Sequence, residues 1–140
     1  MITKHSTFTI DRHFPQPPAK VFAAFADPAM KARWLMAPGH HHELDFRVGG
    51  REVATGGQLR FEATYRDIVD GERIVYCATL HDGDKLSTVS QTTVEFAADG
   101  DGTRLVLIEQ GAYLDDMEQP EWREQGTKSQ FDALAELLAV

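Results

Sequence analysis

A carboxyl group stands in phase with the apolar residues of a strand-like segment near the end of the chain. In residues 103–113 the side chains alternate, so that Leu105, Leu107 and Glu109 share one face. If the two leucines face the core, Glu109 faces it too, and it could serve there as a general acid or base. The alternative is that Glu109 lies near the strand end, solvated or paired with a lysine or arginine. No second catalytic group stands beside it, so Glu109 is only a weak catalytic candidate and the sequence favours a protein that is not an enzyme.

Hydroxyl groups follow the same pattern in two other segments. In residues 86–96, Thr88, Ser90 and Thr92 are in phase with the apolar residues that end the segment, and in residues 58–69 a tyrosine is in phase with Phe61. Apolar walls with a few placed polar groups are typical of a ligand pocket. The residues that we expect to line such a pocket are Trp34, Phe46, Phe61, Tyr65, Tyr76, Thr88, Ser90, Thr92, Leu107, Glu109, Trp122, Thr127 and Phe131.

Three consecutive histidines, His40 to His42, suggest a metal site at first sight. Adjacent residues in an extended segment point to opposite sides, so the three make a poor chelate, and Glu43 is the one carboxylate at ligand spacing. We predict an exposed loop here and no metal. The pairs Gly49-Gly50 and Gly56-Gly57 open no helix, which a phosphate-binding loop requires, so we expect no cofactor either.

The elements that would position these residues can be recognised from periodicity. Phe131, Leu134 and Leu138 follow helical spacing and predict a long final helix, about residues 118–140. Alternation predicts a first strand over residues 6–14. The segments that we expect to follow it are two short helices at 18–26 and 28–35, then strands at 43–48, 51–55, 58–69, 72–80, 86–96 and 103–113.

Short turns join each of the later strands to the next, which permits antiparallel neighbours but no parallel crossover. The order of elements therefore predicts an α+β fold. A curved antiparallel sheet of about six to seven strands would wrap around the long C-terminal helix, with two short helices after the first strand.

Composition narrows the function classes. The chain has 140 residues, enough for one domain, and no apolar run long enough to span a membrane. A formal net charge of −8 argues against a nucleic-acid partner, because phosphate binding needs a basic surface. The single cysteine, Cys77, cannot form an internal disulfide, which favours the cytoplasm, and we expect it to be a small packed side chain.

Several motifs, taken in order, resemble a known family. They are Val21–Phe25 before Asp27-Pro28, Arg33-Trp34-Leu35 before Pro38, Asp45–Gly50, Tyr65–Ile68 before Glu72–Val75, Gly102–Leu105, and Glu-Gln-Gly at 109–111. The order of elements resembles the helix-grip fold of the plant pollen-allergen and lipid-transfer (START-like) proteins. Within that fold, the motifs resemble the bacterial relatives of the activator of the Hsp90 ATPase.

The resemblance covers about residues 8–138 and implies a single START-like (helix-grip) domain over residues 1–140. One position departs from the family pattern: relatives commonly carry Gly-Trp early in the last helix, where this chain has Gly126-Thr127. A hydroxyl in place of an indole should leave space facing the sheet, or a gap that Trp122 partly fills. We therefore expect residues 122–127 to form a pocket wall and the helix from Phe131 onward to be core.

Three functions are compatible with these observations. The leading hypothesis is a cytoplasmic protein that binds a small hydrophobic or amphipathic molecule between the sheet and the last helix. The second is an enzyme of the cyclase or dehydratase type that uses Glu109 with Tyr65. The third, suggested by the family's namesake, is a chaperone-regulating module, which ranks last because the sequence shows no exposed apolar stripe. A homodimer through a strand edge or the short helices is compatible with the sequence but not required by it.

Overall fold

The computed structural model describes residues 1–140, which form seven strands and three helices. In chain order the elements are β1 (Thr3–Phe14), α1 (Pro18–Ala26), α2 (Pro28–Leu35), β2 (His41–Leu44), β3 (Arg51–Gly56), β4 (Leu59–Val69), β5 (Arg73–Asp82), β6 (Lys85–Asp99), β7 (Gly102–Leu114) and α3 (Pro120–Leu138).

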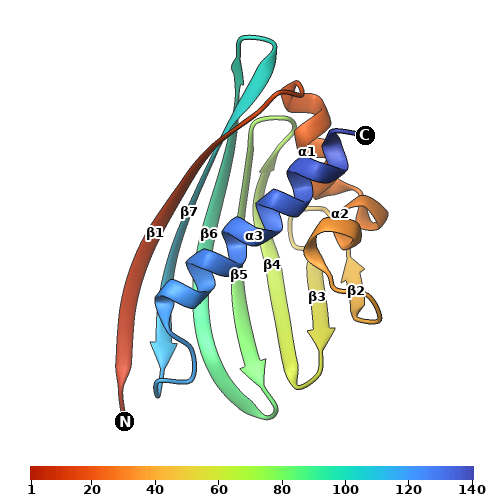
Figure 1. Ribbon diagram of the computed structural model, residues 1–140. Coiled ribbons are helices and arrows are strands. Elements are labelled where there is room, and N and C mark those ends of the chain that lie inside the picture. The colour runs from red at the N-terminus through yellow and green to blue at the C-terminus, as the bar shows by residue number, and fades with distance from the viewer.

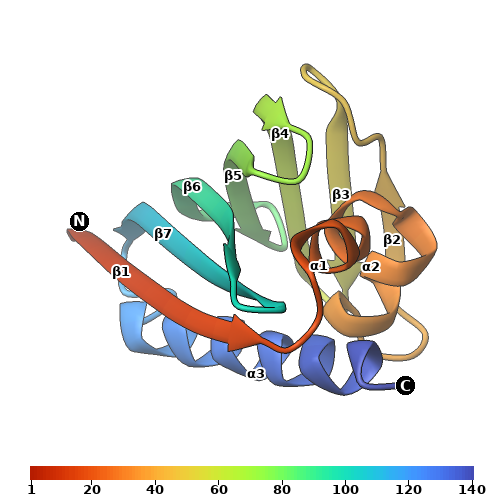
Figure 2. The ribbon, with the colours of Figure 1, turned by 90° about the horizontal axis from the view of Figure 1, so that it is seen from above.

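The seven strands form one antiparallel sheet in the order β1-β7-β6-β5-β4-β3-β2. Figure 1 shows α3 crossing the face of this sheet, and Figure 2 shows the sheet curving round with α1 and α2 inside its end near β2. The predicted α+β architecture is confirmed, including the two short helices after the first strand. No helix of the structure is both long and apolar enough to cross a membrane.

The start of α2 fixes which of its residues face the sheet. The Asp27 carboxylate accepts hydrogen bonds from the backbone N–H groups of Ala29 (2.9 Å) and Met30 (3.2 Å), which satisfies donors that the first helical turn leaves free. From this start, the three-residue spacing of Lys31 and Trp34 places both side chains in the interior.

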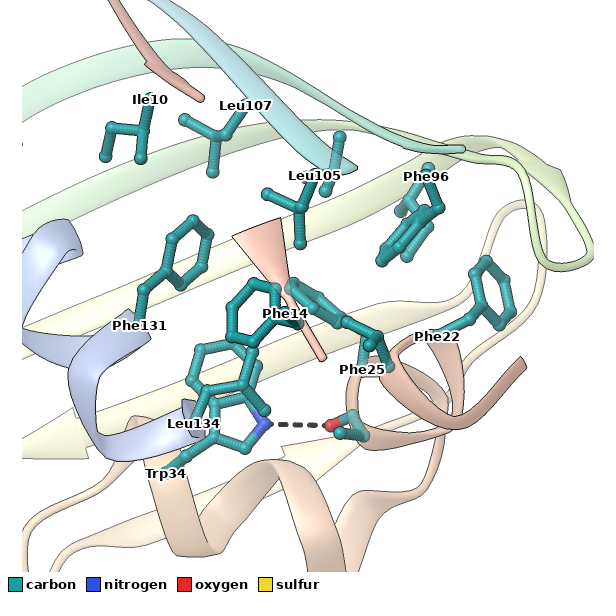
Figure 3. Packing of buried hydrophobic residues seen from close by; sticks show 14 of the residues in the cluster. Ile10, Phe14, Phe22, Phe25, Trp34, Phe96, Leu105, Leu107, Phe131 and Leu134 are labelled. Atoms are coloured by element: carbon teal, nitrogen blue, oxygen red, sulfur yellow. Dashed lines mark hydrogen bonds between the residues drawn. The ribbon is translucent and has the colours of Figure 1, made fainter. Parts of the chain in front are cut away.

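Aromatic side chains fill the interior beneath α1 and α2. The Phe25 ring makes edge-to-face contacts with Trp34, Phe96 and Phe131, with ring centroids 4.9, 5.3 and 6.2 Å apart (Figure 3). The indole N–H of Trp34 donates a 2.9 Å hydrogen bond to the carbonyl of Ala24, the dashed line in Figure 3. This end of the interior is therefore packed mainly with aromatic rings.

The halves of α3 differ as the sequence predicts. Phe131, Leu134 and Leu138 are buried, whereas Thr127 and the residues before it on the helix are exposed or half-buried. The C-terminal half of the helix is therefore part of the hydrophobic core, whereas the N-terminal half is less deeply buried.

The segment around the histidines differs from the prediction. Strand β2 spans His41–Leu44 and ends before the predicted 43–48 strand is complete, so two of the histidines lie in a strand and not in a loop. The chain then turns: the Gly50 N–H donates to the Arg47 carbonyl, and a Cβ at Gly50 would overlap the backbone oxygen of Asp45. The alternating pattern of residues 44–48 thus belongs to a tight turn.

Cys77 is exposed, which corrects the expectation of a packed side chain. Its neighbour Ala78 faces the interior, so alternation along β5 turns the thiol to the other face of the sheet. The helices all lie on the concave face (Figure 2), and nothing covers the thiol on the convex one.

Candidate functional site

A cavity of about 240 Å³ lies between the sheet, α2 and the first half of α3. Twelve of its 18 lining residues are hydrophobic, which gives it mainly apolar walls. The residues predicted from sequence that line it are Trp34, Phe61, Tyr65, Tyr76, Leu107, Glu109, Thr127 and Phe131. The structure therefore brings together eight of the 13 predicted residues.

A row of polar side chains crosses the floor of the cavity. In the strand register Glu109 pairs with Thr92, Thr92 with Tyr76, and Tyr76 with Tyr65, so the row runs over β7, β6, β5 and β4. Its two ends belong to two separate clusters of buried charges. Tyr76 lies between them and lines the cavity.

The first of these, the Lys31 cluster, consists of Lys31, His42, Glu52 and Tyr65. The Glu52 Oε1 atom accepts hydrogen bonds from Lys31 Nζ and from the Tyr65 hydroxyl, both at 2.7 Å, and Oε2 accepts one from His42 Nε2 at 2.7 Å. Lys31 Nζ also donates to the Tyr65 oxygen at 3.1 Å. The side chains of Lys31, His42 and Glu52 are 7%, 4% and 1% exposed, so these polar groups are held inside the protein.

The surroundings of Glu52 keep it ionised. Burial alone would raise its pKa, but the charge of Lys31 and the hydrogen bonds from His42, Lys31 and Tyr65 outweigh burial and lower the pKa to about 2. Burial, followed by the charge and hydrogen bond of Glu52, raises the pKa of Tyr65 far above its ordinary value. At neutral pH the cluster thus contains a carboxylate and a protonated tyrosine.

The second, the Arg123 cluster, consists of Thr88, Thr92, Glu109, Glu118 and Arg123. The guanidinium donates to Glu109 Oε2 at 3.1 Å, to the Thr88 hydroxyl at 2.6 Å and to Glu118 Oε2 at 2.9 Å. The Thr92 hydroxyl donates to Glu109 Oε1 at 2.8 Å. Burial alone would lower the pKa of Arg123, but the charges of Glu109 and Glu118 outweigh it and raise the pKa.

Both of the alternatives considered for Glu109 describe part of its environment. Its side chain is 8% exposed and lines the cavity, and it is also paired with an arginine. Both carboxylate oxygens accept hydrogen bonds, and Tyr65, its predicted catalytic companion, donates to Glu52 in the other cluster. This geometry makes Glu109 a fixed anchor and does not favour an acid–base role.

Four predicted residues are buried or half-buried behind the cavity wall. Thr88 and Thr92 support the Arg123 cluster from the sheet below, and Ser90 lies in register between Ala78 and Gly111 without bordering the cavity. The ring of Phe46 is not in the wall, because it packs edge-to-face on Tyr65 with centroids 5.1 Å apart. Thr88, Thr92 and Phe46 thus each contact a residue that lines the cavity.

Trp122 requires a correction. It is 64% exposed, so it neither forms a pocket wall nor fills the gap beside Thr127. The helical stripe that faces the sheet passes instead through Arg123, four residues before Thr127, and both residues line the cavity.

Three charged residues that line the cavity escaped the sequence prediction. Arg123 is on the same helical stripe as Thr127, and Lys31 precedes Trp34 by three residues, so spacing alone could have indicated both. Glu52 gave a misleading signal, because the adjacent Val53 suggests the opposite strand phase. In the structure Glu52 points inward and Val53 is half-buried.

The histidines separate as adjacent strand residues do. His42 enters the Lys31 cluster, whereas His41 pairs with Glu43 on the surface at 3.0 Å. No group of three or more His, Cys, Asp or Glu side chains is placed to hold a metal ion.

Comparison with known proteins identifies the family of the chain. The family model for Activator of Hsp90 ATPase homolog 1-like protein matches residues 15–139, nearly the whole chain. The chain belongs to this family. No curated protein sequence matches it.

Solved structures of the same fold include two proteins of similar size. The Mll3558 protein from Rhizobium loti is 43% identical over 98% of this chain and 99% of its own, with a TM-score of 0.90. A putative uncharacterized protein from Rhizobium leguminosarum is 34% identical over 99% of this chain and 97% of its own, with a TM-score of 0.93. DynU16, a putative protein in the dynemicin biosynthetic locus, shares the fold at 16% identity, over 96% of this chain and 47% of its own, with a TM-score of 0.74.

Proposed function

We propose that this family member binds a small hydrophobic or amphipathic molecule in the cavity between the sheet and α3. The observation that carries the proposal is the cavity itself, with mainly apolar walls and polar groups at two defined places. The family's fold supports it, because proteins of this architecture commonly hold hydrophobic ligands.

The size of the cavity restricts the ligand. Its volume of about 240 Å³ is slightly below the range of about 300–1,000 Å³ that holds drug-sized ligands. Each methylene-sized group that moves from water into the cavity gains about 0.8 kcal/mol. A compact apolar body therefore supplies most of the affinity, and the Lys31 and Arg123 clusters orient its polar end.

Binding of N-phenyl-1-naphthylamine, an uncharged dye that fluoresces in apolar surroundings, tests the proposal. We expect a saturable rise in fluorescence, and native mass spectrometry should show one dye per chain. Thr127→Trp places an indole in the cavity wall and should abolish this signal. Ser129→Trp adds the same indole at an exposed position of α3 and is the matched control. Equal binding by both variants would place the dye elsewhere and overturn the proposal.

We also propose that the protein acts in the cytoplasm. The support is the exposed, unpaired Cys77, since a reducing compartment keeps such a thiol free. Labelling of Cys77 with a maleimide in intact cells, compared with lysed cells, tests this placement. Complete labelling by a membrane-impermeant reagent in intact cells would contradict it.

A further inference from the structure

Lys31 has an unused hydrogen-bond donor at the cavity. An ammonium group has three N–H bonds, and the structure provides two acceptors for them, Glu52 Oε1 and the Tyr65 oxygen. The side chain is 7% exposed and belongs to the cavity lining, so a molecule that occupies the cavity can reach the third N–H. A buried donor without an acceptor is costly, so a ligand oxygen that accepts this N–H gains a favourable polar contact.

The carboxylates in the cavity wall are, by contrast, already engaged as acceptors. Glu52 accepts three hydrogen bonds and Glu109 accepts two. A ligand that offers only a donor would have to displace one of these bonds. The charged groups of the wall therefore favour a ligand that accepts a hydrogen bond over one that donates.

The charges around the cavity exclude an ionic ligand. Four ionised groups line it: Lys31 is paired with Glu52 at 2.7 Å, and Arg123 is paired with Glu109 at 3.1 Å. Each of the two cations is thus paired with a carboxylate of the wall, and Arg123 is also paired with Glu118 at 2.9 Å. An additional charge would lose its hydration and find no unpaired partner.

We propose that the cavity selects a compact, uncharged ring compound with a carbonyl oxygen that accepts the third hydrogen bond of Lys31. The ring would lie against Phe61 and Tyr76, whose ring centroids are 6.5 Å apart in an edge-to-face arrangement that suits another aromatic or alicyclic body. This inference rests on the proposed function and specifies the ligand class for the same site.

Four naphthalene probes of similar size test the inference by calorimetric titration. 2-Acetylnaphthalene has the carbonyl acceptor, 2-isopropylnaphthalene replaces it with an apolar group, 2-naphthoate is an anion, and 2-naphthylmethylamine is a cation at neutral pH. We expect the acetyl probe to bind about tenfold more tightly than each of the other three, as one hydrogen bond to a charged donor supplies.

A double variant, Lys31→Met with Glu52→Gln, tests the assigned donor. It removes both charges together, so that neither is left unpaired, and the glutamine keeps an oxygen for Tyr65. We expect the preference for the acetyl over the isopropyl probe to fall to within about twofold, with isopropyl binding retained. Lys128→Met, at an exposed position of α3, should keep the tenfold preference.

The outcomes separate the two proposals. If no probe binds, the proposed function fails and this inference fails with it. If the probes bind without preference, or if the naphthoate binds most tightly, the cavity is a binding site but the assigned ligand class is wrong. A preference that survives in the double variant would overturn the role of Lys31.

Discussion

The two ends of the concave face show two different ways to build an interior. Beneath the C-terminal half of α3, the ring of Phe25 packs edge to face on Trp34 and on Phe131, and Trp34 lies tilted against Phe131 (Figure 3). Beneath its N-terminal half, Arg123 is buried beside a cavity that Lys31 borders from α2, and each of the two cations is held by carboxylates.

This difference separates stability from binding along one helix. Close-packed aromatic rings gain hydrophobic and dispersion energy, whereas buried ion pairs lose hydration and seldom stabilise more than an apolar core would. The aromatic end should therefore determine the stability of the fold, and the charged end should determine what the cavity accepts. Variants at each end can test that division.

The largest effect should come from the aromatic end. Phe14 is fully buried against Phe131, and Phe14→Ala should lower the free energy of unfolding by about 4 kcal/mol, because it leaves a void in a rigid core. Urea denaturation measures this loss. Phe61→Ala at the half-buried cavity wall should lower the free energy of unfolding by less than half as much. Equal losses in the two variants would contradict the division between the two ends.

A charge removed alone from the other end should rank second. Lys31→Met leaves the buried Glu52 carboxylate without its ion partner and should lower the free energy of unfolding by about 3 kcal/mol. Adding Glu52→Gln should restore most of that loss. If the double variant is as unstable as the single one, the lysine matters for packing and not for charge.

The third-largest effect should be a loss of stability at acid pH, caused by Glu52. The pKa of Glu52 is about 2 in the folded protein and near its usual value of 4.5 in the unfolded chain, so the unfolded state takes up the proton first as pH falls. The stabilisation is complete above pH 4.5 and is lost as pH falls towards 2. Between pH 6 and pH 3, we expect protonation linked to Glu52 to lower the free energy of unfolding by about 2 kcal/mol. Denaturation of the Lys31→Met, Glu52→Gln double variant should show a correspondingly smaller loss.

The smallest effect on stability should come from filling the cavity. Thr127→Trp should raise the free energy of unfolding by about 1 kcal/mol as the indole fills the cavity, while it prevents ligand binding. Thermal unfolding with and without 2-acetylnaphthalene measures both effects. A variant that is destabilised and still binds the probe would show that the indole does not fill the cavity.

Periodicity was enough to predict the fold, because it depends on neighbours along the chain. Alternation of side chains and the turn residues between strands indicated the sheet, and the spacing of Phe131, Leu134 and Leu138 indicated the covering helix. The exception, residues 43–48, shows the limit of this approach: a turn around Gly50 can imitate the alternation of a strand.

The site was only partly predictable, because its ion pairs join residues that are far apart in the sequence. The apolar wall followed from strand phase, but Lys31 meets Glu52 from another layer, 21 positions away in the chain. Charged residues are rarely buried, so the spacing of Lys31 and Arg123 gave a signal that their residue types seemed to contradict. Trp122 misled in the opposite sense, as a large apolar residue on the solvent side.

The positions of the two tryptophans provide an optical assay that needs no added label. Trp34 is 5% exposed and borders the cavity, whereas Trp122 is 64% exposed to solvent. Iodide should quench the emission of Trp122 and leave that of Trp34 almost unchanged. In a Trp122→Phe variant, the single remaining indole would report directly, through its emission wavelength, when the cavity becomes occupied.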